Sequence, residues 1–182
     1  MIHTIHFLCP VMPNTVNQLQ ERCFSAIANG ATQINLHMSS SGGDITSGFT
    51  GYNFLKTLPI PVTTFNISNI DSIANVIFLA GSERNANNRA RFLLHPFQWG
   101  LGGIQTVDHE RMREWVSSLD HDLERFIDIF KSEVGDHDWR EMIKSSKIIN
   151  PADALSYGII NHINDALVPN PNGTPTIWWV TG

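Results

Sequence analysis

The sequence predicts an α/β fold whose strands form a parallel sheet. Short runs rich in β-branched residues alternate with longer amphipathic runs, and this alternation is typical of parallel strands joined by helices. Hydrophobic residues make up 42% of the 182 residues, which is enough to bury a core and argues against a disordered chain. This length suits one domain, or one domain with an appendage.

The first half of the chain provides most of this alternation. Strands are expected over residues 4–8, 33–38, 62–67 and 90–95, and helices over 14–30, 45–58 and within 68–81. Gly30 ends the first helix, and Pro59 and Pro61 end the second because proline cannot continue a helix. Gly48 and Gly51 weaken that second helix.

The second half begins with a long charged helix, expected over about residues 104–134. Its single apolar stripe consists of Ile104, Val107, Met112, Trp115, Leu119, Leu123, Phe126, Phe130 and Val134. A helix of about 30 residues would be about 45 Å long, which is more than a compact domain of this size needs. Such a helix either projects and packs against a partner subunit or lies across its own domain, and the sequence leaves both possibilities open.

Three short elements and a tail complete the chain. Helices are expected over 137–146 and 151–157, with a strand over 159–163. These elements close a domain that covers residues 1–165. Residues 166–182 contain Pro, Asn and Gly followed by two tryptophans, so we expect an extended arm that docks through Trp178 and Trp179.

Composition and charge disfavour several classes of partner. The formal net charge is −5, only 12 residues are Lys or Arg, and no basic run occurs, so nucleic acid and anionic membranes are not expected partners. No apolar run reaches about 18 residues, and the N-terminus lacks the pattern of a signal peptide. Cys9 and Cys23 cannot form a disulfide framework and lack metal-ligand spacing. We therefore expect a cytoplasmic protein with no metal and no cofactor.

Ser72 lies where a polar stretch meets a continuous apolar run, in the segment SNIDSIANVIFLAG. Two interpretations are open. The serine can cap a buried helix by accepting a hydrogen bond from a free backbone amide, or it can be a nucleophile at the positive end of that helix. The local pattern alone favours the cap.

Two further features could complete an acyl-transfer site around Ser72. Gly42 and Gly43, in SSSGGD, allow backbone amides to face a ligand without interference from a Cβ, as an oxyanion hole requires, although an ordinary tight turn uses the same pattern. His95 closes an apolar strand, where a histidine is more often structural than a base. Gly43, Ser72 and His95 each follow a strand, and ligand sites in parallel α/β sheets collect at the carboxyl ends of strands. One edge of the sheet could therefore hold all three groups.

Four segments, taken in order, resemble a known family. They are INLHMSSSGGDITSGFTGYNFLK, SNIDSIANVIFLAG, FLLHP and NPADALSYGIINHI. Their order and spacing resemble the proteolytic subunits of the Clp protease, a family of serine peptidases, over about residues 5–165. The resemblance implies the Clp protease/crotonase-like fold, in which repeated β-β-α units form a superhelical core and a handle helix projects from it. The handle would fall on residues 104–134.

The resemblance also implies roles for individual residues. Ser72 would be the nucleophile, His95 the general base, the amides of Gly43 and Ile73 the oxyanion hole, and Gly42 and Ile45 would contact the substrate. It further implies a homo-oligomer, a ring of six or seven subunits or two stacked rings, that cleaves peptide or unfolded protein substrates.

Several residues depart from the family pattern. Ser41 replaces a proline, Ser68 a glycine, and Asp71 the alanine beside the nucleophile. Counting back from NPADALSYG, the aspartate that orients the histidine is replaced by Ser146, whose hydroxyl can bind an imidazole but cannot stabilise an imidazolium with a full charge. Other carboxylates in this part of the chain are Asp136, Asp138 and Asp153. The sequence also starts at the first core strand, without the family's segment that helps dock an ATPase, so the need for an ATPase partner is left open.

Three functions follow from these observations. The first is a Clp-like serine endopeptidase. The second is a catalytically weak or inactive Clp-like subunit that acts as an assembly partner, which Ser146 would favour. The third is a crotonase-type acyl-CoA enzyme, although the stretch around Ser72 has no glutamate before Glu83.

Overall fold

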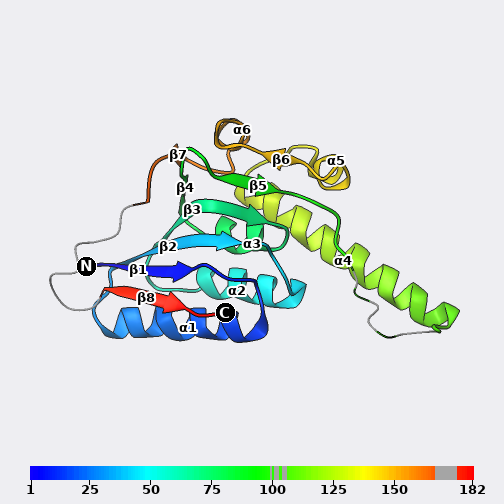
Figure 1. The fold of residues 1–182 in the computed structure, drawn as a ribbon, viewed down its shortest axis with the longest axis horizontal. Helices are drawn as coiled ribbons and strands as arrows, with labels where there is room; N and C mark the ends of the chain where they lie inside the picture. Colours follow the sequence, from blue (N-terminus) through cyan, green and yellow to red (C-terminus); the bar gives the residue numbers. More distant parts are fainter. Residues whose placement is uncertain (99, 101–102, 104–105, 167–175) are drawn as a thin grey trace.

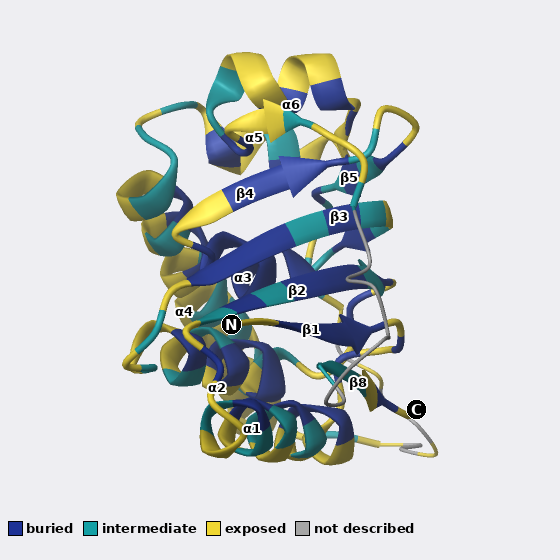
Figure 2. Ribbon diagram, turned by 90° about the vertical axis from the view of Figure 1, so that its left-hand side faces the viewer, coloured by how far each residue is buried: buried dark blue, intermediate teal, exposed yellow. Residues whose placement is uncertain are grey.

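The computed structural model describes every residue of the chain except 99, 101–102, 104–105 and 167–175. A twisted sheet lies at the centre of the molecule, and one long helix extends away from it (Figure 1). The helices α1, α2 and α3 cover one face of the sheet (Figure 2). The carboxyl ends of the central strands therefore meet at one edge, beside the start of these helices.

The described elements follow one another in an alternating order. They are β1 (Ile2–Phe7), α1 (Pro13–Ala28), β2 (Gln33–Ser40), α2 (Ile45–Lys56), β3 (Val62–Asp71), α3 (Ala74–Leu79), β4 (Glu83–Ala86), β5 (Arg91–Leu93), α4 (His109–Glu133), α5 (Trp139–Lys144), β6 (Ile148–Ile149), α6 (Pro151–Tyr157), β7 (His162–Ile163) and β8 (Ile177–Val180). The strands run in the order β6-β5-β3-β2-β1-β8, with β4 pairing to β3 and β7. All of these pairings are parallel except that of β5 with β6. The expected parallel α/β fold is confirmed.

Strand β3 differs most from the sequence expectation, because it continues past residue 67 to Asp71. Its first part, residues 63–66, pairs with β4, and its last part, residues 69–71, pairs with β5. One strand thus changes its partner along its length, and the stretch that the sequence suggested as the approach to a helix is strand. The short strands β4 and β6 were not expected either.

The two glycines that weaken α2 in isolation are required by its packing against α3. A Cβ at Gly48 would lie 2.2 Å from Cγ1 of Ile73, and a Cβ at Gly51 would lie 3.0 Å from Cδ1 of Ile77. Both isoleucines are fully buried. The low helix propensity of the glycines is therefore offset by a close approach of α3, which holds the residues around Ser72 in place.

Helix α4 begins and ends inside the expected range, and residues 104 and 105 lie outside the described part of the chain. Its inner end is packed into the domain through Phe126, Ile127 and Phe130, all of which are buried. Its outer end extends away from the sheet (Figure 1), and Met112 and Val116 are exposed there. The helix thus packs on its own domain at its inner end and projects from that domain at its outer end. None of the described helices has the length and hydrophobicity needed to cross a membrane.

The end of the tail adds a strand to the sheet. β8 pairs in parallel with β1, and its register places Trp178 opposite Ile5 and Trp179 opposite His6. The indole of Trp178 donates a hydrogen bond to Nδ1 of His3 (3.1 Å). Trp179 stacks on His6 with ring centroids 4.1 Å apart.

Candidate active site

Gly42 and Gly43 join β2 to α2 and bring the chain against two other segments. Gly42 has φ 84°, and a Cβ there would lie 2.7 Å from Cβ of Ser72. Gly43 has φ 149°, and a Cβ there would lie 2.2 Å from the carbonyl oxygen of Val11. The Val11 N–H donates to the Gly42 oxygen (2.9 Å), and the Asp44 N–H donates to the Val11 oxygen (2.7 Å). Only glycine fits at either position.

Ser72 stands between β3 and α3 with φ 56°, a left-handed conformation that is uncommon for a residue other than glycine. Its N–H donates to the Leu93 oxygen (2.9 Å). The N-cap residue of α3 is Ile73, which makes no side-chain capping bond. Within the described residues no hydrogen bond engages Ser72 Oγ, so the structure does not support the capping interpretation. Backbone strain of this kind concentrates at functional sites.

The backbone amides of Gly43 and Ile73 are both available at this site. In the described part of the chain neither N–H donates to another group, whereas the amides of Ser72 and Asp44 beside them are both paired. Gly43 is exposed, whereas Ile73 is fully buried, where a backbone donor without a partner is uncommon. Gly42 approaches Ser72 closely and Ile73 follows it, so both amides belong to segments that meet at this serine.

His95 follows β5 at the same edge of the sheet and is half-buried. The preceding residues connect it to Ser72, because Leu93 accepts the hydrogen bond from the Ser72 N–H. Its Nδ1 lies 2.8 Å from the carbonyl oxygen of Pro96. The described residues include no hydrogen bond between His95 and Ser72, so the fold brings the two segments together without closing a Ser–His contact.

Ser146 lies on the other side of His95. The N–H of Leu94 donates to the oxygen of Lys147 (3.0 Å), which continues the antiparallel pairing of β5 with β6. Ser146 is exposed and has φ 54°. The segments that carry Ser72, His95 and Ser146 are therefore neighbours in space, in that order.

Two of the other carboxylates in this part of the chain have structural roles. Asp138 caps α5 by accepting from the Glu141 N–H (3.1 Å). Asp153 accepts a hydrogen bond from the side chain of Asn150 (3.0 Å) at the start of α6. Asp136 is exposed before α5.

A polar network beside Ser72 was missed by the sequence reasoning. Oδ2 of Asp71 accepts from Arg91 (3.0 Å) and from Asn69 (3.1 Å), while Oδ1 of Asp71 is buried and has no partner in the described residues. The Ser39 hydroxyl donates to the Asn69 side chain (3.1 Å). The alternation of Asn69 and Asp71 on one strand face was the available signal, but it required knowing that β3 extends this far.

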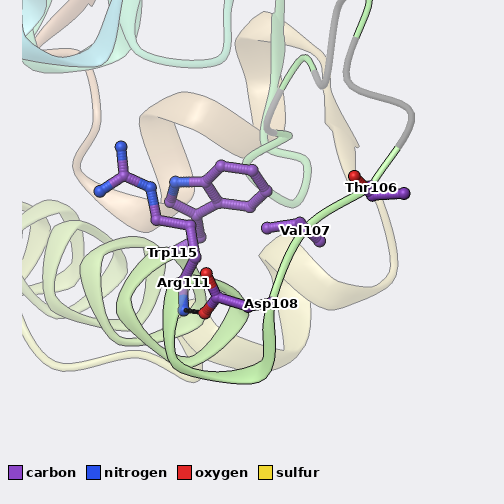
Figure 3. Close-up of a pocket in the computed structure, with 5 residues that line it drawn as sticks. All are labelled: Thr106, Val107, Asp108, Arg111 and Trp115. Atoms are coloured by element: carbon purple, nitrogen blue, oxygen red, sulfur yellow. Dashed lines mark hydrogen bonds between the residues drawn. The ribbon is translucent and has the colours of Figure 1, made fainter.

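Two of the cavities lie along α4. One of about 380 Å³ begins beside His95 and is lined by Pro96, Phe97, Leu119, Asp120, Leu123, Arg140, Ile143 and Lys144. Another, of about 590 Å³, lies at the outer end of α4 and is lined by Thr106, Val107, Asp108, Arg111 and Trp115 (Figure 3). The latter shares no residue with the edge that holds Ser72. Among the described residues, no group of three or more His, Cys, Asp or Glu side chains could hold a metal ion.

Comparisons with known proteins agree with this fold. The family model described as Clp protease matches residues 4–166. The "ATP-dependent Clp protease proteolytic subunit" of Deinococcus radiodurans is 25% identical over 150 residues, which cover 80% of this chain and 71% of that protein. A solved structure of a ClpP1 mutant from Listeria monocytogenes superposes with a TM-score of 0.79 at 15% identity, covering 90% of this chain and 92% of the other, and so shares the fold. The chain therefore belongs to the Clp protease family and has the fold of a Clp-type peptidase.

Proposed function

We propose that this protein is a serine endopeptidase in which Ser72 is the nucleophile and His95 the general base. The observation that carries the proposal is the conformation of Ser72. This left-handed residue carries a hydroxyl without a hydrogen-bond partner in the described residues, and the amides of Gly43 and Ile73, from the segments that meet there, are also without a partner in those residues. Close glycine contacts hold this region in place, because Gly42 approaches Ser72 itself and Gly48 approaches the next residue, Ile73.

Peptide hydrolysis would proceed in two acyl-transfer stages. Ser72 Oγ attacks the scissile carbonyl carbon while its proton passes to Nε2 of His95, and the carbonyl oxygen becomes an oxyanion. The amides of Gly43 and Ile73 stabilise that oxyanion. His95 then gives its proton to the leaving amine, and water repeats the sequence to release the acyl group from Ser72 and regenerate the enzyme.

The surroundings of the site suit an extended peptide. Gly42 lies in the turn before α2 and Ile45 is the first residue of α2, and both would contact the substrate chain beside the oxyanion hole. The cavity next to His95 would take a side chain, and its walls are mostly apolar, with Phe97, Leu123 and Ile143 among them. We expect a preference for apolar side chains at the position that enters this cavity.

The oligomer belongs to the same proposal. The exposed apolar residues on the outer end of α4 would pack against a second copy of the chain, and the family implies a ring of six or seven subunits or two stacked rings. Cleavage of a protein substrate by the purified protein, measured with and without an added ATPase, would show whether an ATPase delivers substrates to this assembly.

The test is covalent labelling with a fluorophosphonate, which reacts with activated serines. Ser72→Ala should abolish labelling and peptidase activity, and it should leave the unfolding midpoint in urea nearly unchanged because Ser72 caps no helix. Ser41→Ala, in the exposed part of the neighbouring turn, should label normally.

A competing function, an inactive Clp-like subunit, has a specific observation in its favour. Ser146 replaces the acid, and no Ser72–His95 hydrogen bond is formed in the described residues. Wild-type protein that assembles but neither labels nor cleaves a small peptide ester would favour this alternative over the peptidase.

A further inference from the structure

The family's orienting aspartate is absent here, yet Nδ1 of His95 has a partner. It lies 2.8 Å from the carbonyl oxygen of Pro96. We propose that Pro96 is a positioning residue whose backbone carbonyl takes over the orienting part of the missing acid's role. This inference rests on the proposed function, in which His95 is the base.

A carbonyl oxygen can only accept a hydrogen bond, so the Nδ1···O contact requires a proton on Nδ1. In the neutral ring, Nε2 then carries the lone pair. This is the tautomer that can take a proton from Ser72 Oγ. When it does so, His95 becomes an imidazolium that still donates Nδ1–H to Pro96, and the Nε2 proton later leaves with the amine.

The position of this carbonyl is constrained on both sides. The proline ring fixes φ of Pro96 and restricts His95, the residue before it, to extended backbone. Phe97, on the other side of the carbonyl, contacts Phe126 of α4 edge-to-face, with ring centroids 5.3 Å apart. Leu94, before His95, is held by its hydrogen bond to Lys147.

The Pro96 carbonyl orients the His95 ring as the aspartate would. It offers the imidazolium only a dipole, whereas an aspartate offers a full negative charge. In serine proteases, a neutral replacement of the aspartate costs about 10⁴-fold in turnover, largely because the histidine takes the wrong tautomer. Here the contact with Pro96 already selects the Nδ1–H tautomer of His95. The remaining deficit should therefore be the loss of charge stabilisation alone, which is much smaller.

The direct test is the protonation of the ring nitrogens, measured by solid-state NMR on protein labelled with ¹⁵N in its histidines, at a pH where the rings are neutral. His95 should carry its proton on Nδ1. His137 provides an internal control of the opposite kind, because its Nε2 lies 3.0 Å from the carbonyl oxygen of Tyr157 and should carry the proton. The ¹⁵N signal that disappears in a His95→Asn variant is assigned to His95. A proton on Nε2 of His95 would overturn the proposal.

Two variants extend the test. Pro96→Gly keeps the carbonyl but releases its position, so the Nδ1–H form should decrease and fluorophosphonate labelling should slow several-fold. Pro59→Gly, at an exposed proline after α2, should change neither. If Pro96→Gly retains the wild-type tautomer, Pro96 has no positioning role.

The Ser146→Asp variant distinguishes two causes of a low turnover, a wrongly oriented His95 ring and the loss of a carboxylate charge beside it. It should raise turnover by about ten-fold at most, which corresponds to about 1.4 kcal/mol of transition-state stabilisation. A rise approaching 10⁴-fold would show that the wild type lacks the correct tautomer, and would overturn the proposal. The NMR measurement does not depend on activity, so an inactive protein with Nδ1–H would contradict the proposed peptidase and leave the role of Pro96 intact.

Discussion

His6 and His37 face one another on the sheet surface opposite the one that α1, α2 and α3 cover. Their exposed fractions are 6% and 2%, and their rings meet edge-to-face with centroids 5.0 Å apart. His37 also contacts Phe65, and Trp179 covers His6. Burial lowers the pKa of His37 from 6.5 to about 4, and the nearby His6 adds to the effect. Burial also lowers the pKa of His6. The fold therefore disfavours the protonated form of both rings.

This pair predicts a loss of stability in mild acid. The unfolded chain takes up a proton on His37 as the pH falls below 6.5, whereas the folded chain does not until about pH 4. The free energy of unfolding therefore falls across this window, by about 2 kcal/mol at pH 5 from His37 alone. His37→Phe should reduce the difference between pH 7 and pH 5 in urea unfolding by about that amount. The same substitution at exposed His121 is the control, and equal effects of the two would contradict the prediction.

At the scale of the elements, hydrophobic periodicity together with caps and breakers was sufficient to locate most of the helices. α6 was located at its observed bounds, and α1, α2, α4 and α5 within a few residues, because each has caps or breakers in its own sequence. Strands β4 and β6, of four and two residues, exist only through pairing to distant segments, which one sequence cannot reveal. The extension of β3 to Asp71 has the same cause.

The sequence alone could predict which residue types form the candidate site and which edge of the sheet holds them, but not their local geometry. The segments of Gly43, Ser72 and His95 do gather at one edge, as the carboxyl ends of parallel strands should. The left-handed backbone of Ser72 and the contact of His95 with Pro96 depend on tertiary packing and could not be foreseen.

The apolar residues of helix α4 differ in exposure along its length. Phe126 and Phe130 are in the core of the domain, so charging them would unfold it. Further out, Met112 of the stripe is 47% exposed, and Val116, one turn on and not part of the stripe that the sequence predicted, is 59% exposed. The sequence alone treated the stripe as uniform, but only its outer part is available for assembly.

Met112→Glu combined with Val116→Glu should therefore dissociate the oligomer and leave the fold intact. Two carboxylates at a desolvated helix contact would have no partners, and burying unpaired charge is costly. Light scattering should show a smaller particle, with an unchanged circular dichroism spectrum. Ser118→Glu with His121→Glu adds similar negative charge on the opposite, exposed side of the helix and should assemble normally. A wild type that is already monomeric at micromolar concentration would contradict the prediction.

At the scale of the whole molecule, one guanidinium connects the carboxyl ends of three helices. Arg84 is 8% exposed and donates to the oxygens of Gly81 (3.4 Å), Glu133 (3.1 Å), Gly158 (3.2 Å) and Ile159 (2.8 Å). These carbonyls stand at the ends of α3, α4 and α6, where unpaired oxygens and the helix dipole favour a cation. Burial lowers the pKa of Arg84, and the charge of Glu133 opposes that shift.

Helix α2 provides a second attachment for the inner end of α4. The Tyr52 hydroxyl donates to Glu133 Oε1 (2.6 Å), and Lys56 pairs with the same oxygen (2.9 Å). Burial, and then the hydrogen bond to Glu133, raises the pKa of Tyr52 to about 12, so this hydroxyl remains a donor throughout the physiological range. The handle is thus fixed to the domain at its inner end by groups from α2 and β4.

Arg84→Lys should show how much of the fold depends on this single group. Lysine keeps the charge but has one nitrogen, which cannot reach four carbonyls spread around a planar guanidinium. Hydrogen bonds to a charged group contribute about 1.5–3 kcal/mol each, and buried carbonyls left without a donor add to the loss. We expect the free energy of unfolding to fall by about 3 kcal/mol, measured from urea transitions at pH 7. Arg89→Lys, at an exposed arginine in the loop after β4, should change it by less than about 0.5 kcal/mol. If both variants unfold at the same urea concentration, Arg84 does not connect the helices in the way the structure indicates.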